Sequence, residues 1–125
     1  MNDNREYDLE ERLVTYSALV IALTETLPSS RVGNHSAAQL LRSGTASAPN
    51  YGEAEAAESR KDFLHKMGIC LKELRESRIW LRILAHLSLL NQSELAPVLS
   101  ETEELIRIFK ASIATAKRNG SKADF

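Results

Sequence analysis

The sequence predicts an all-α protein, folded as an antiparallel up-down-up-down four-helix bundle. Four segments repeat apolar residues at the spacing of an α-helix. The stretches between these segments are short and contain turn formers, and short connections force neighbouring helices to run antiparallel. Only five Gly and three Pro occur in 125 residues, and aromatic residues make up 6%, which favours helices over sheets.

The first helix is expected over residues 8–27, with Asp8 as its N-cap. Its apolar stripe comprises Leu9, Leu13, Tyr16, Val20, Leu23 and Leu27. The second helix is expected over residues 33–57 and carries mostly small side chains, which allow a neighbouring helix to approach closely. Pro49 removes a backbone donor and predicts a kink near residues 43–50. Two short helices separated at Pro49 are the alternative.

The third helix is expected over residues 59–90, with Ser59 as N-cap and Asp62 completing a capping box. It carries two apolar stripes, which indicates burial on more than one side. The first comprises Phe63, Met67, Cys70, Leu74, Leu81 and Leu84, and the second Leu64, Leu71, Ile79, Trp80, Ile83 and Leu87. The fourth helix is expected over residues 94–118, and residues 119–125 are expected to form a tail. The chain is therefore predicted to be a single domain, 1–125.

Composition restricts the cellular setting. Hydrophobic residues make up 43% and charged residues 26%, and the net charge is −1, so no overall field attracts nucleic acid or anionic lipid. The longest apolar run, residues 18–23, is far shorter than the roughly 20 residues that span a bilayer. A single cysteine and an acidic N-terminus without a signal-peptide pattern favour a cytoplasmic protein that does not bind membranes.

The candidate chemical groups predict no catalytic site, no metal site and no cofactor. His35 lies on the second segment, His65 and His86 lie 21 residues apart on the third, and only His65 has a nearby acidic residue at helical spacing, Asp62. A metal-binding bundle needs several such pairs. Cys70 lies on an apolar stripe, so we expect a buried structural thiol.

Charge is unevenly distributed along the chain. Residues 59–90 contain seven basic and three acidic residues, a net of +4, whereas residues 1–30 have a net of −4. Arg75, Arg78 and Arg82 share one face of the predicted third helix. They are candidate nucleic-acid-binding residues, through contacts to phosphates. The alternative is that they pair with acidic residues along the same helix or on helices one and four.

Polar residues cluster around Pro49, where a helix should be partly buried. Arg42, Asn50, Glu53 and Arg60 are predicted to form a structural polar network that satisfies backbone groups freed by the proline. A ligand pocket is the alternative interpretation.

The surplus apolar stripe of the third helix predicts an interface between copies of the chain. Four helices close one core, so this stripe would otherwise lie in water, and exposed apolar patches usually mark interfaces. The candidate interface residues are Leu64, Ile79, Trp80, Ile83 and Leu87. Trp80 filling the bundle's own core is the alternative.

Three polar blocks, residues 40–45, 48–54 and 58–63, resemble in order the bacterial four-helix bundle proteins encoded in intervening sequences of 23S ribosomal RNA genes. Residues 71–76 and 104–106 also fit, and the resemblance covers about residues 7–118. It implies a ring-like homopentamer without enzymatic activity. Related accessory variability proteins of diversity-generating retroelements bind nucleic acid and a reverse transcriptase through a basic surface. The leading hypothesis is a self-assembling interaction scaffold, and the alternative is an RNA- or DNA-binding accessory protein.

Overall fold

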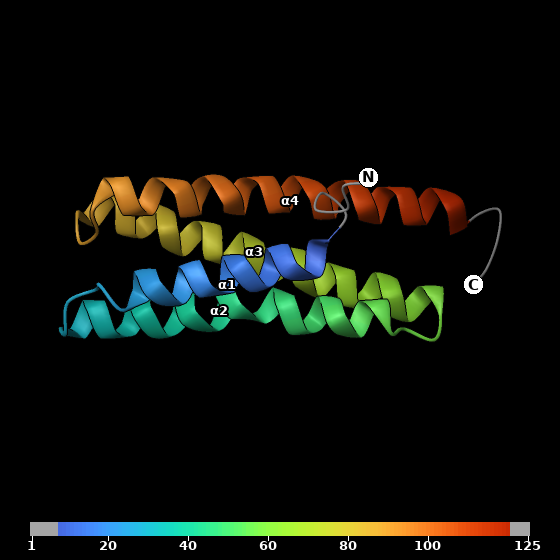
Figure 1. The fold of residues 1–125 in the computed structure, drawn as a ribbon, viewed down its shortest axis with the longest axis horizontal. Coiled ribbons are helices and arrows are strands. Elements are labelled where there is room, and N and C mark those ends of the chain that lie inside the picture. The colour runs from blue at the N-terminus through green and yellow to red at the C-terminus, as the bar shows by residue number, and fades with distance from the viewer. Residues whose placement is uncertain (1–7, 121–125) are drawn as a thin grey trace, which may run out of the picture.

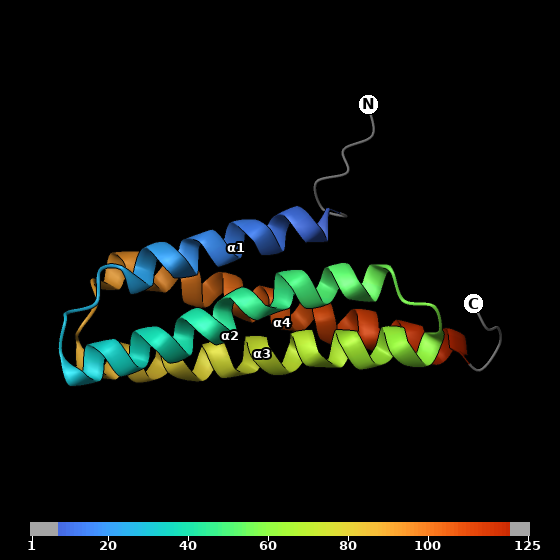
Figure 2. The same ribbon diagram turned by 90° about the horizontal axis from the view of Figure 1, so that it is seen from below.

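The four helices pack in chain order around one core (Figures 1 and 2). The computed structural model describes residues 8–120. The helices are α1 (Leu9–Thr24), α2 (Arg31–Glu55), α3 (Arg60–Leu87) and α4 (Gln92–Gly120). Contacts join each helix to the next, and α1 to α4, so the bundle closes. The predicted all-α, four-helix fold is confirmed, and residues 8–120 contain no strand.

Side-chain caps fix where three of the helices begin. Asp8 accepts a hydrogen bond from the backbone N–H of Glu11, and Ser59 accepts one from that of Asp62, both as predicted. Ser30 caps α2 in the same way, through the N–H of Gly33. These oxygens satisfy backbone donors that the first turn of a helix leaves without partners.

The helix bounds differ from the sequence-based expectation in several places. Helix α1 ends at Thr24, α2 begins at Arg31, and α3 ends at Leu87. Helix α2 continues through Pro49 as one element, so the two-helix alternative is wrong, while the kink stays a prediction. Helix α4 reaches Gly120, so residues 119–120 are helical and not a tail, and residues 121–125 lie outside the described residues.

The core is apolar except for a band of hydroxyl groups near its middle. Its largest members that are fully buried include Tyr16, Phe109, Leu13, Leu40, Met67 and Leu74. Four of the buried hydroxyls, one from each helix, form what we call the polar layer: Tyr16, Ser43, Ser77 and Thr102. Tyr16 Oη lies 2.7 Å from Thr102 Oγ1, and Ser77 donates to Ser43 over 2.9 Å. Burial raises the pKa of Tyr16, and its hydrogen bonds with Thr102 and Ser77 oppose that rise. A buried hydroxyl without a hydrogen-bond partner is costly. The polar layer therefore favours the positions of the four helices along the bundle axis at which these hydroxyls meet.

Candidate functional site

The predicted arginine stripe lies on the flank of α3 that faces α4. The Arg78 guanidinium reaches across and donates to Glu103 of α4 over 3.3 Å. Arg75 and Arg82 are exposed, and neither forms an ion pair with a carboxylate of residues 8–120. The alternative interpretation, pairing with acidic residues, therefore holds for Arg78 alone.

The predicted polar network around Pro49 is wrong, because its four members have separate partners. Arg42 pairs with Glu73 and Glu76 of α3, and Glu53 pairs with Lys66 over 2.6 Å. The Arg42 and Glu53 side chains are 51% and 58% exposed, so neither group is buried.

The other two members of that network bond to backbone carbonyls. Asn50 donates to the carbonyl of Ala46, one turn earlier in α2, and Arg60 donates to that of Ala116 in α4. Asn50 thus bonds within its own helix and does not reach α3. Arg42 and Glu53 form separate surface ion pairs that join α2 to α3.

Four of the five candidate interface residues occupy neighbouring turns near the C-terminal end of α3. Ile79, Ile83 and Leu87 follow one another at intervals of four residues and are 47%, 39% and 47% exposed. Trp80 lies beside them, half-buried, with its ring edge-on to His35 of α2 and its N–H directed at Glu76. Leu64 is partly buried and lies about 22 Å away along the helix, so it does not belong to this patch. We call Ile79, Ile83 and Leu87 the α3 patch.

The single thiol and the histidines give no reactive or metal-binding constellation. Cys70 is fully buried, as predicted, and its thiol donates to the carbonyl of Ser47 over 3.5 Å. Burial raises the pKa of Cys70 to about 12, so a nucleophilic thiolate is disfavoured. Asp62 and His65 line a shallow hollow at the start of α3. Across residues 8–120, no three His, Cys, Asp or Glu residues are placed to hold a metal ion.

Sequence reasoning missed a groove between α1 and α4. Tyr16, Thr15 and Leu19 line its first part together with Asp8, Glu11, Arg12 and Glu101, enclosing about 380 Å³. Leu19 also borders the second part, of about 330 Å³, with Ala22, Leu23, Thr26, Glu94 and Pro97. One signal was available: residues 13–24 contain no charged residue, although α1 is a surface helix. Val14, Leu19 and Ile21 are accordingly 47%, 44% and 44% exposed.

The fold and these surfaces define a four-helix bundle with exposed apolar side chains on α1 and α3. None of the described helices has an apolar stretch long enough to cross a membrane. The model of the 23S rRNA-intervening sequence protein family matches residues 5–111, and the chain belongs to this family. The identification made from the polar blocks is thereby confirmed.

A solved structure supports the same assignment. The chain resembles a protein of unknown function from the S23 ribosomal protein family of Bacteroides thetaiotaomicron, with a TM-score of 0.78 and 27% sequence identity. The match covers 83% of this chain and 96% of the other. No curated protein matches the chain.

Proposed function

We propose that the protein is a non-enzymatic, self-assembling bundle that serves as an interaction scaffold. The observation that carries this proposal is the α3 patch, three large apolar side chains exposed on consecutive turns. Exposed apolar patches of this kind are typical of interfaces between proteins, and Trp80 beside the patch is a residue type that often anchors them.

A second exposed apolar face supports assembly into a ring. Ser17 of α1 bonds to the carbonyl of Gly44 in α2, so in these antiparallel helices Ile21 lies opposite the turn containing Leu41. Val14, Ile21 and Leu41, which we call the α1–α2 patch, are all more than 40% exposed. Two different patches on one chain suit head-to-tail contacts, which generate closed rings when the rotation closes. The number five comes from the family resemblance.

Mixing two disabled variants tests this proposal. Light scattering of the wild type at micromolar concentration should give a mass several times 13.9 kDa. Ile83→Asp should disable the α3 patch and Ile21→Asp the α1–α2 patch, so each variant alone should be monomeric. Their mixture should form a one-to-one heterodimer, because one intact pair of patches remains.

Several outcomes would contradict the scaffold proposal. The control, Ala111→Asp on the exposed side of α4, should assemble like the wild type. A folded wild-type monomer would refute self-assembly. An Ile21→Asp variant of wild-type mass, or a mixture that stays monomeric, would refute head-to-tail pairing.

RNA or DNA binding is the second candidate function, and the exposed Arg75 and Arg82 favour it. To test it, RNA or DNA is added to the protein in the light-scattering experiment. Absorbance at 260 nm then reports how much nucleic acid is bound to the protein. Contacts to phosphates would give binding that weakens steeply with salt and falls further after Arg75, Arg78 and Arg82 are replaced by Ala. Binding that is absent at about 50 mM salt, where such contacts are strong, would exclude this candidate.

A further inference from the structure

We propose that the groove between α1 and α4 is a docking site for a basic amphipathic helix of a partner protein. The two parts of the groove adjoin at Leu19, which lines both, and they follow one another along α1 as what we call the channel. The channel borders the least extensive of the four helix–helix contacts in the bundle. This inference does not depend on self-assembly, which we assigned to the other side of α1 and to α3.

The shape of the channel suits a helix. It extends from Asp8 to Thr26 along α1, about 27 Å at 1.5 Å per residue, which is the length of a helix of about 18 residues. Its walls carry the short side chains of Thr15 and Ala22, which allow a third helix to approach closely. Leu19, which is 44% exposed and lines both parts of the channel, provides apolar contact for the stripe of an amphipathic partner, above the buried Tyr16 and Leu23.

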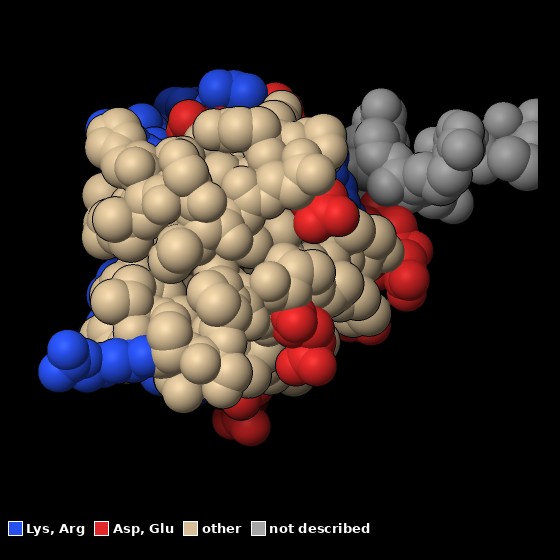
Figure 3. Space-filling view, turned by 90° about the vertical axis from the view of Figure 1, so that its left-hand side faces the viewer, with Lys and Arg blue, Asp and Glu red and all other residues tan. Residues whose placement is uncertain are grey.

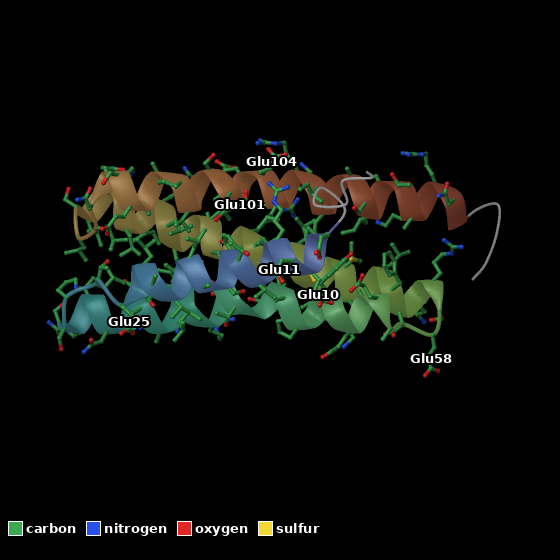
Figure 4. All side chains as sticks on the ribbon, in the orientation of Figure 1. Glu10, Glu11, Glu25, Glu58, Glu101 and Glu104 are labelled. Carbon is green, nitrogen blue, oxygen red and sulfur yellow. The ribbon has the colours of Figure 1, made fainter. Side chains whose placement is uncertain are left out.

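The charges specify a basic partner. Asp8 and Glu11 lie at one end of the channel, and Glu94 lies at the other. The basic residue that lines it, Arg12, is neutralised by Glu101, to which it donates over 2.7 and 3.0 Å. Glu11 of α1 and Glu101 of α4 both line the first part of the groove, and Figure 4 labels both. Viewed end-on, acidic side chains gather along one side of the molecule and basic ones mostly on the other (Figure 3).

The spacing of these charges favours a separate partner over the stripe of Arg75, Arg78 and Arg82 in a second copy of this chain. The acidic ends of the channel are about 22 Å apart, counted at 1.5 Å per residue from Glu11 in α1 to Thr26, two residues beyond its end. The basic stripe of α3, from Arg75 to Arg82, spans only about 10 Å. A matching helix instead has an uncharged apolar stripe in its middle and Lys or Arg near both ends.

A designed peptide tests the docking site. The probe is an 18-residue fluorescent helix with a Leu stripe and two Lys residues at each end, measured by anisotropy against the full chain. Ala22→Phe should fill the channel and abolish binding. The double variant Glu11→Gln/Glu94→Gln should weaken binding by about tenfold at low salt, because rim charges act mainly on association. Glu58→Gln, an exposed acidic position far from the groove, is the control and should bind like the wild type.

Each alternative outcome would overturn the docking proposal. A peptide with Glu in place of Lys that binds equally well would refute charge recognition. Binding that survives Ala22→Phe would place the peptide elsewhere. If Ala22→Phe instead lowers the mass of the assembly, the groove is a contact between copies. Circular dichroism should show that every variant keeps its helical content.

Discussion

The contact between α2 and α3 is closely packed, whereas the contact between α1 and α4 borders an open groove. Between α2 and α3, small side chains are completely buried: Ser43, Ser47 and Ser77 are 0% exposed, and the thiol of Cys70 reaches the Ser47 carbonyl. Between α1 and α4, the direct bonds are those of Tyr16 with Thr102 and of Arg12 with Glu101, and the rest of the boundary opens into a groove. Small buried residues thus close the contact between α2 and α3, whereas α1 and α4 leave accessible surface between them.

Helix length adds to this difference. Helix α1 has 16 residues, whereas α2 and α3 have 25 and 28 and lie side by side over most of their length (Figure 2). A short helix buries less apolar surface, and apolar burial is the main source of stability. The stability of the bundle should therefore depend more on the long helices α2, α3 and α4 than on α1, which is free to present a binding surface.

The largest expected difference between the two contacts comes from shortening a leucine. Leu40→Ala in α2 removes a fully buried side chain and should lower the free energy of unfolding by about 2–5 kcal/mol. Leu19→Ala in the groove removes an exposed side chain and should cost less than about 1 kcal/mol. Urea denaturation at equal protomer concentration measures both changes. Equal losses would show that the groove is closed in solution.

Removing single hydroxyls between α2 and α3 should act in opposite directions. Ser77→Ala leaves the Ser43 hydroxyl without its donor and should cost about 1–2 kcal/mol. The Ser47 hydroxyl is buried without a hydrogen-bond partner, so Ser47→Ala should instead raise the free energy of unfolding by about 1 kcal/mol. Thermal unfolding of the two variants makes the comparison. A destabilised Ser47→Ala protein would contradict the burial of this hydroxyl.

The smallest effect is expected for the ion pair across the groove. Arg12→Ala removes a bidentate contact whose side chains are 34% and 25% exposed, and it should cost about 0.2–1 kcal/mol, less at high salt. Glu101 accounts for most of the rise in the pKa of Arg12. Arg107→Ala is the control, because its partner Glu104 lies within the same helix. A loss that is unchanged in 1 M salt would argue against an electrostatic origin.

The four helices and the burial of Cys70 could be predicted, because periodicity and capping residues are local signals. Register between helices is not local, and this is why the polar network was wrong. Arg42 pairs with Glu73 and Glu76, which lie 31 and 34 residues later in the sequence, on another helix. Spacing within one helix cannot reveal that pairing. Periodicity also gives the direction of the apolar face of a helix but not its width, so it does not reveal the exposure of Leu19 and Ile21, for which the uncharged run 13–24 is the available signal.

Trp80 gives the protein a built-in optical probe. It is the only tryptophan of the chain, and it lies half-buried beside the α3 patch with its ring edge-on to His35. Its fluorescence therefore comes from one location, at the surface where we expect copies to meet. Emission from an indole moves to shorter wavelengths when water is excluded from it. Simple dilution of the unlabelled protein can thus follow association at this surface, without a reporter group that would disturb the contact.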